Sequence, residues 1–277
     1  MSSTHTNSFQ FVDAGRDLGV TVLNAVMSDF AYGKHAHEEL AVGVTLDGMQ
    51  EFTCRGRWFR SAPGNIILLN PGDVHNGNPG GGLALKYTML YLDPVAFNQL
   101  MGCAADSERS EFRLPENHIV DPELQALVLR MVRLAVRPGA TRFDAEACLY
   151  ALARRLTQRL GLYRPDGWTD IKDTLLLRAR DYIHDNIGED LSIDDLSRAA
   201  HLSKYHFIRM FRSQFGLTPH QYIINQRINR VREGLGAGLP PTDAALRFGF
   251  FDVSHMNRHF KRIYGVTPKQ YQRQLAG

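Results

Sequence analysis

Short apolar runs separated by turn residues occupy the first hundred residues. The runs lie at Val20–Val26, Leu40–Leu46, Met49–Cys54, Trp58–Arg60, Ile66–Leu69 and Leu83–Leu92. Between them stand the turn sequences Asp47-Gly48, Pro63-Gly64, Pro71-Gly72 and Pro79-Gly80-Gly81-Gly82. Many short strands at regular spacing predict an antiparallel β-barrel or sandwich.

After residue 120 the apolar residues recur at helical spacing. A helix is predicted over Asp121–Val136, with Leu124, Leu127, Val128, Met131, Leu134 and Ala135 on one face. A second helix is predicted over Phe143–Leu162, with Ala147, Tyr150, Ala151, Arg154 and Leu160 on one face. Pro138-Gly139 separates the two helices.

The boundary between two domains is expected at Pro165-Asp166-Gly167, which follows the second helix. From Ile171 onward, glycine and proline stand only at expected helix ends. The expected fold class is therefore α+β and multidomain. A β-barrel followed by helices is expected over residues 1–165, and an all-α domain over residues 170–277.

The predicted all-α domain contains an internal repeat. Gly216-Leu217-Thr218-Pro219-His220-Gln221-Tyr222 reappears 49 residues later as Gly265-Val266-Thr267-Pro268-Lys269-Gln270-Tyr271. The same offset pairs His206 with His255, Arg209 with Arg258, Phe211 with Phe260 and Arg212 with Lys261. Two copies of one unit are therefore expected, joined by a helix over Pro219–Leu235 whose end is left open by Gly234, Gly236 and Gly238.

Each copy has the pattern of two helices joined by a tight turn. In the first copy Ser192 caps a helix that runs to about Ala200, and Ser203 caps a second helix that ends at Gly216. The second copy has a helix from Thr242 to about Arg247, the turn Phe248-Gly249-Phe250, and a helix capped by Asp252 that continues to Tyr264. An amphipathic, basic second helix makes each copy a candidate helix-turn-helix unit.

Side chains that face away from the apolar side of each second helix are the candidate DNA contacts. They are Ser203, Lys204, Tyr205, Ile208, Arg209 and Arg212 in the first copy, and Val253, Ser254, Asn257, Arg258 and Lys261 in the second. In the major groove arginine forks to guanine, asparagine and serine bond base edges, and apolar groups meet thymine methyls. Phosphate contacts are expected from Lys261, Lys269, Arg273 and the helix N-termini.

The charge distribution supports a nucleic-acid partner. Residues 201–277 carry 12 Lys and Arg against three Asp and Glu, whereas residues 1–200 carry 20 against 26. A basic segment on an otherwise acidic chain is typical of a protein that binds a polyanion such as double-stranded DNA.

These motifs resemble those of the AraC/XylS family of transcription regulators. The run from Ser203 to Arg212 and the closing Gly-x-Thr-Pro-x-x-Tyr resemble the first unit of that family, and Phe248-Gly249-Phe250 followed by Ser254–Arg262 resembles the second. The resemblance covers about residues 175–275. It implies a sequence-specific activator that acts together with RNA polymerase. The two recognition helices of such a protein enter successive major-groove segments ~34 Å apart.

Two N-terminal segments resemble the motifs of the cupin barrel family, which often precedes such a DNA-binding domain. They are His35-Ala36-His37-Glu38-Glu39, and His75 after Asn70-Pro71-Gly72-Asp73-Val74. The resemblance implies that residues 1–165 form a cupin-like sensor domain. Since alternate residues of a strand face the same side, we expect His35 and His37 to point into the barrel.

Two interpretations of these histidines stay open. In metal-binding cupins the equivalents of His35, His37, His75 and a glutamate, here Glu39 or its neighbour Glu38, hold a divalent ion. Alternatively, the barrel binds a small-molecule effector without a cofactor. The candidate effector-binding residues are His35, His37, Glu39, His75, Tyr32 and Trp58. The aromatic residues Phe52, Tyr87 and Tyr91 are weaker candidates for the same pocket or are core residues.

The helices at 121–136 and 143–162 have more apolar surface than a linker requires. The family resemblance implies a homodimer contact there, and packing against their own barrel is the alternative.

Other properties of the chain narrow its class. No run approaches the ~18 apolar residues of a membrane helix, and the N-terminus lacks the pattern of a secretory signal, so no membrane partner and a cytoplasmic location are expected. Cys54, Cys103 and Cys148 form no close pair, which favours free thiols in the core. No nucleophile elbow, phosphate-binding glycine loop or paired CxxC motif is present, so the chain is not expected to be an enzyme. The competing hypothesis is a metal-dependent cupin enzyme with an appended DNA-binding domain.

Overall fold

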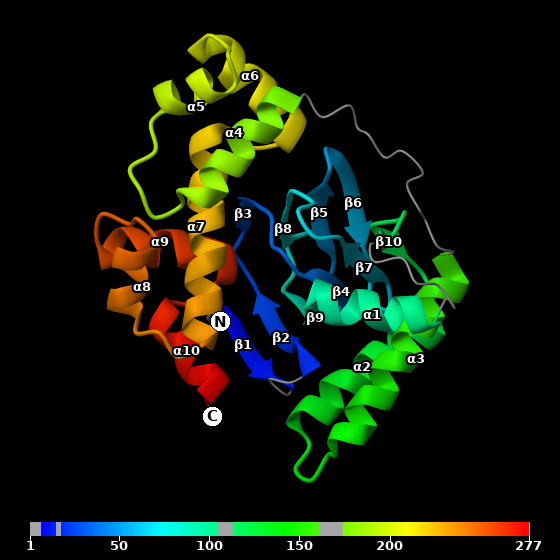
Figure 1. Ribbon diagram of the computed structural model, residues 1–277. Helices are drawn as coiled ribbons and strands as arrows, with labels where there is room; N and C mark the ends of the chain where they lie inside the picture. The colour runs from blue at the N-terminus through cyan, green and yellow to red at the C-terminus, as the bar shows by residue number, and fades with distance from the viewer. Residues whose placement is uncertain (1–6, 15–17, 105–112, 161–173, 277) are drawn as a thin grey trace. The chain divides into compact units, whose positions relative to one another are not determined.

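The computed structural model describes residues 7–14, 18–104, 113–160 and 174–276, which form two compact units that divide near Arg164 (Figure 1). The expected linker at Pro165-Asp166-Gly167 lies outside the described residues. None of the helices in the described ranges is long and apolar enough to cross a membrane.

The N-terminal unit is built on two antiparallel sheets. The described strands are β1 (Ser8–Asp13), β2 (Val20–Met27), β3 (Tyr32–His35), β4 (Leu40–Asp47), β5 (Gln50–Cys54), β6 (Arg57–Ser61), β7 (Ile66–Leu69), β8 (His75–Pro79), β9 (Leu85–Leu92) and β10 (His118–Ile119). One sheet has the order β1-β2-β9-β4-β7-β10 and the other the order β3-β8-β5-β6. The β-rich N-terminal domain predicted from the turn pattern is therefore confirmed.

Side-chain alternation sorts the six-stranded sheet into two faces. Val22 and Val42 both pair with Leu90, and all three are buried in the core that also includes the unit's helices. On the opposite face Gly43 pairs with Met89. A Cβ atom on Gly43 would lie 2.6 Å from the Met89 sulfur, so a larger residue would collide with that side chain. The period of two thus buries both faces of the strands.

Helices α1 (Pro94–Ala104), α2 (Pro122–Val136) and α3 (Arg142–Leu160) complete this unit, and Figure 1 shows α2 and α3 side by side. Asp121 caps α2 by accepting a hydrogen bond from the Leu124 amide, and the same carboxylate binds Arg155 of α3 at 2.9 Å. Leu124, Val128 and Met131 bury the predicted face of α2 in the sheet core.

The prediction of which face of α3 is buried was wrong. Core positions are Ala145, Cys148, Leu149, Leu152, Ala153 and Leu156, whereas Ala147, Tyr150 and Arg154 are exposed. Both faces have helical spacing and small or apolar residues, so periodicity alone did not distinguish them. The side of α3 that packs on its own sheet is thus the one opposite to the face named from the sequence, and Leu162 lies outside the described residues.

The described cysteines outside α1 are buried free thiols, as predicted for Cys54 and Cys148. Burial, with Asp73 as a smaller cause, raises the pKa of Cys54 to about 12. The side chain of Cys103 lies outside the described residues.

The C-terminal unit is entirely helical in its described part. Its helices are α4 (Thr174–Asp185), α5 (Ile193–Ala199), α6 (Lys204–Phe215), α7 (Pro219–Gly236), α8 (Pro241–Arg247), α9 (Val253–Tyr264) and α10 (Pro268–Ala276). Figure 1 shows α7 running through the unit, with α4, α5 and α6 at one end and α8, α9 and α10 at the other. The two predicted helix-turn-helix pairs, α5–α6 and α8–α9, are both present.

The two copies of the 49-residue sequence repeat have the same packing and the same helix ends in the structure. Phe211 packs edge-on against Tyr222 at 5.4 Å, and their equivalents Phe260 and Tyr271 do so at 5.6 Å. Gly216 and Gly265 end α6 and α9 with the same left-handed φ of 75°. The duplicated sequence therefore encodes two copies of one packing arrangement.

The joining helix ends within one residue of its predicted boundary at Leu235. α7 continues through Gly234 to Gly236, and Ala237 is its C-cap. A Cβ atom on Gly234 would lie 3.2 Å from both Leu239 and Phe248, so this glycine permits the chain after α7 to pack closely on the helix. Only Gly238, at φ +90°, lies beyond the helix end with a left-handed backbone.

Candidate functional site

The predicted contact residues of α6 form an exposed row. Ser203, Lys204, Tyr205, Ile208, Arg209 and Arg212 are all solvent-exposed. Tyr205 exposes 79% of its surface, although a tyrosine of this size is usually at least partly covered. Phe207 and Phe211 are fully buried on the opposite side of the same helix. The helix is thus anchored by its apolar side and presents a basic, aromatic side to solvent.

The equivalent helix α9 has the same construction. Met256 and Phe260 are fully buried, while Ser254, Arg258 and Lys261 are exposed. Val253 and Asn257 are half-buried at the edge of this surface. Arg209 and Arg258, which the repeat pairs, are therefore exposed on the corresponding sides of the two helices.

Two N-terminal residues of α6 differ from the sequence expectation in detail. Ser203 stands at the N-cap position, but its side chain makes no capping hydrogen bond. Lys204 forms an ion pair with Asp194 of α5, at 2.7 Å between Nζ and Oδ1. Both partners are exposed, so this pair contributes little stability and leaves Lys204 accessible to a phosphate.

Arg227 on α7 links the two helix-turn-helix halves, and sequence reasoning missed it. Its guanidinium donates to the carbonyls of Ile187 at 3.0 Å and Glu189 at 2.6 Å, just before α5. It also donates to the carbonyl of Gly249, in the turn between α8 and α9. A Cβ atom on Gly249 would lie 2.8 Å from this guanidinium. The arginine thus connects the α4–α5 loop and the α8–α9 turn to one helix.

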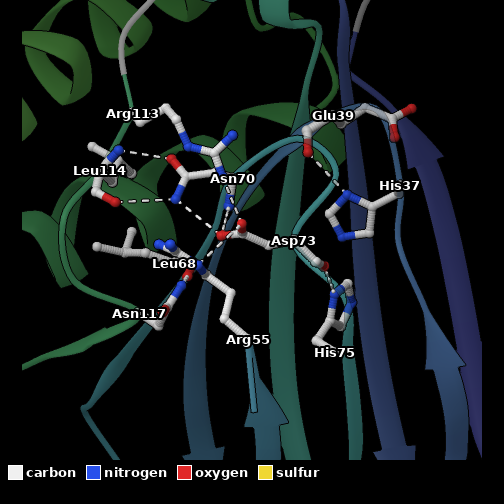
Figure 2. A network of polar contacts seen from close by, with 10 residues as sticks. All are labelled: His37, Glu39, Arg55, Leu68, Asn70, Asp73, His75, Arg113, Leu114 and Asn117. Atoms are coloured by element: carbon white, nitrogen blue, oxygen red, sulfur yellow. Dashed lines mark hydrogen bonds and ion pairs between the residues drawn. The ribbon is translucent and has the colours of Figure 1, made fainter. Parts of the chain in front are cut away.

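In the N-terminal unit a polar network surrounds Asp73 (Figure 2). The side chain of Asn70 donates to Asp73 at 3.1 Å, and Arg113 forms an ion pair with Asp73 at 2.6 Å. Asn70 also exchanges hydrogen bonds with both backbone groups of Leu114. Since Asn70 and Asp73 are buried, these bonds fix the loop that leads into β8 and so position His75.

His37 and His75 lie next to each other in this interior. Their rings meet edge to face with centroids 4.9 Å apart. Nδ1 of His75 donates to the carbonyl of Asp73 at 2.7 Å, and Nδ1 of His37 donates to the carbonyl of Glu39 at 2.9 Å. Burial, with the neighbouring His37 as a smaller cause, lowers the pKa of His75 to about 3. His75 is therefore a neutral ring whose Nε2 is an acceptor.

Other buried polar groups line the interior around β5 and β8. The hydroxyls of Tyr32 and Tyr87 bond each other at 2.8 Å, and burial raises the pKa of both tyrosines. A Cβ atom on Gly77 would lie 3.6 Å from the amide of Gln50 and 3.9 Å from Tyr32, so both side chains border this glycine. Gln50 was not predicted as a site residue, because a lone glutamine in a strand carries no distinguishing pattern.

The sequence expectations for this interior are only partly met. His35 ends β3 but His37 follows it in a loop, so the two do not project from one strand as expected. The ring of His37 is nevertheless buried. Trp58 is 60% exposed on β6 and does not belong to the interior with Tyr32. Trp58 and Arg60 are two residues apart and share the exposed face of β6, whereas Phe59 and Ser61 are covered on the other face.

The possible metal ligands do not form a metal site. Nowhere in the described ranges do three His, Cys, Asp or Glu side chains come together in a group able to hold an ion. Figure 2 shows the carboxylate of Glu39 turned away from the rings of His37 and His75. His35 uses Nδ1 to bond the carbonyl of Gly33. These residues therefore fit hydrogen bonding better than they fit a divalent ion.

Family models match both units of the chain. Residues 18–153 match the AraC-like ligand binding domain, and residues 196–274 match a helix-turn-helix domain. The chain is 28% identical over 228 residues to the uncharacterized HTH-type transcriptional regulator YbfI of Bacillus subtilis strain 168, which covers 81% of each chain. It is 32% identical over 92 residues to the multiple antibiotic resistance protein MarA of Salmonella typhimurium, covering 33% of this chain and 72% of MarA.

A solved structure has a similar fold over the whole chain. The fatty-acid-bound ToxT of Vibrio cholerae strain SCE256 aligns with a TM-score of 0.58 at 12% identity, covering 100% of this chain and 99% of ToxT. This similarity confirms the predicted order of a β-rich domain followed by a helical one. The two family matches, the similarity to MarA and the duplicated helix-turn-helix show that the chain belongs to the AraC/XylS family of transcription regulators, with an N-terminal ligand-binding domain and a C-terminal DNA-binding domain.

Proposed function

We propose that this protein activates transcription at specific promoters, where α6 and α9 read two adjacent segments of the major groove. The observation that carries the proposal is the pairing of Arg209 and Arg258. Both are exposed at equivalent positions of two units that share one packing arrangement and are joined through α7. An arginine in the major groove bonds guanine with two hydrogen bonds.

In this proposal the N-terminal unit binds a small polar effector. The neutral ring of His75 offers an acceptor nitrogen, and the hydroxyls of Tyr32 and Tyr87 lie in the same unit. His37, Glu39 and Gln50 supply further buried polar groups. Effector binding would alter DNA affinity through a coupling free energy that acts equally in both directions.

We further propose that the protein works as a homodimer in the cytoplasm and contacts RNA polymerase at its promoters. The exposed side of α3 supports the dimer, because Phe143, Ala147, Tyr150 and Arg154 follow one another at helical spacing. Phe143 is 76% and Tyr150 44% exposed, although both are large and apolar. A helix face of this kind is typical of an interface between chains.

Replacing the two arginines tests the DNA-reading assignment. Arg209→Ala and Arg258→Ala are each expected to cost about 1–3 kcal/mol of specific binding, with a smaller loss on random DNA. Fluorescence anisotropy with a selected site and a scrambled duplex measures both losses. Arg230→Ala is the matched control, because Arg230 is an exposed arginine of α7 that pairs with Glu233. Equal losses on both duplexes would mean that the arginines contact only phosphates.

A further inference from the structure

Two histidines on α9 bring their ring nitrogens together. His255 and His259 are four residues apart, so they share one side of the helix. Their Nε2 atoms lie 3.1 Å apart, and the rings meet edge to face with centroids at 4.8 Å. Both side chains are half-buried, and the ring of Phe250 packs edge-on against His255 at 5.6 Å. The pair is therefore held in place and is not a chance meeting of two mobile side chains.

The spacing of the two nitrogens suits a shared metal ion. With metal–nitrogen bonds of ~2.0–2.1 Å, two nitrogens 3.1 Å apart subtend an angle of about 97° at the ion. This angle lies between the octahedral and tetrahedral values. Two histidines separated by four residues on a helix are an arrangement that binds zinc in other proteins.

The two Nε2 atoms are hydrogen-bonded to each other, so one ring donates a proton and the other accepts it. An ion bound to both nitrogens would replace this hydrogen bond and release the shared proton to solvent.

We propose that His255 and His259 form a binding site for a divalent transition-metal ion of the zinc, nickel or copper class on the DNA-binding helix α9. Imidazole nitrogens suit these ions. Since no third His, Cys, Asp or Glu joins a ligand group in the described residues, water completes the coordination and the ion exchanges readily. A bound ion adds positive charge beside Arg258 and Arg262, so metal and DNA affinities are linked.

The internal repeat supplies a matched control within the same chain. The equivalents of His255 and His259 in α6 are His206 and Met210, so the first unit has one histidine and lacks the second. The site is therefore expected in α9 and not in α6. Met210→His would give the first unit the same pair of histidines.

Isothermal titration of the full chain, carrying no affinity tag, with Zn²⁺ at pH 7.5 tests the site. His259→Asn is expected to remove one bound ion per chain or to weaken its binding at least tenfold. His206→Asn is expected to leave binding unchanged, and Met210→His to add one ion. Zinc should also raise the Tm of the unaltered protein more than that of His259→Asn.

Two results would overturn the site. One is an unaltered protein that binds no zinc, and the other is a His259→Asn variant that binds zinc with the same stoichiometry and affinity. Thermal unfolding without metal shows whether each variant folds. If His259→Asn does not fold, His255→Asn decides the question, because zinc binding with unaltered stoichiometry and affinity in that variant would exclude the site. DNA binding is not needed for any of these readouts, so they are independent of the proposed function.

Discussion

His75 could be picked out from its sequence motif, but its burial and its contacts could not be predicted from the sequence. Its position after the Asn70–Val74 segment was visible as a motif. Its burial, its hydrogen bond to the Asp73 carbonyl and its contact with His37 depend on how β8 returns to the sheet. As a result, the pKa of His75 is lowered to about 3, and the ring stays neutral well below the pH at which a histidine is ordinarily protonated.

Because the pKa of His75 is lowered in the folded protein, we expect acid to destabilise the N-terminal unit. The pKa of His75 is about 3 in the folded protein and ordinarily 6.5, so below pH 6.5 the unfolded chain takes up the proton first. Stability is therefore lost as the pH falls from 6.5 towards 3. Between pH 7 and pH 5 the expected loss is about 2 kcal/mol in the free energy of unfolding. Urea unfolding at a series of pH values between 7 and 5 measures it.

His75→Gln keeps a polar side chain and removes the titration. The variant is expected to be less sensitive to pH over this range than the unaltered protein. A variant with the same pH dependence would show that other groups cause the acid destabilisation.

The exposure of single residues was predicted well where it depends only on the position of the residue around one helix. Arg209, Arg258 and Lys261 are exposed as expected, because the helical period separates them from buried Phe211 and Phe260. Trp58 and His37 were misplaced, since their positions depend on strand pairing and on a loop. Arg227 was missed because its three carbonyl partners come from distant turns.

Helices and strands were predicted to different degrees. Capping residues marked α5 and α9 closely, since Ser192 and Asp252 each accept a hydrogen bond from a backbone amide three residues ahead. Ser203 marks the start of α6 but makes no capping hydrogen bond. Strands β1, β3, β8 and β10 and helix α1 were not predicted. β8 has the sequence His-Asn-Gly-Asn-Pro, which favours turns, and it becomes a strand through its neighbours in the sheet.

At the level of elements, Arg227 is expected to set the relative position of α6 and α9. Arg227→Lys keeps the charge but cannot donate to three carbonyls in the same fork. We expect roughly tenfold weaker binding to a DNA site with both half-patterns, since a lost hydrogen bond costs about 1–3 kcal/mol. Binding to a single half-pattern should change little. Anisotropy titrations with duplexes of varied half-pattern spacing measure both.

Arg230→Lys on the same helix is the control for this substitution. Its side chain is exposed and pairs only locally with Glu233, so it should leave spacing preference unchanged. If Arg227→Lys weakens whole and half sites alike, Arg227 supports folding and does not set the spacing.

For the whole molecule, we expect a homodimer that forms through the exposed apolar face of α3. The double variant Phe143→Ser, Tyr150→Ser is expected to convert a dimer into a monomer, because it removes the large apolar groups from that face. Analytical ultracentrifugation of the full chain measures the mass. Leu83→Ser is the control, since Leu83 is 68% exposed in a turn of the same unit. A dimer that persists in the double variant would place the interface elsewhere.

If the two helix-turn-helix units read two neighbouring segments of DNA, the protein binds sites made of two half-patterns. Selection and sequencing of genomic fragments bound by the purified full chain, repeated at several salt concentrations, reveals such sites. We expect an enriched motif with two half-patterns about one helical turn, or ~10 base pairs, apart. Salt-sensitive binding without any enriched motif would contradict this expectation, because phosphate contacts alone would then account for the affinity.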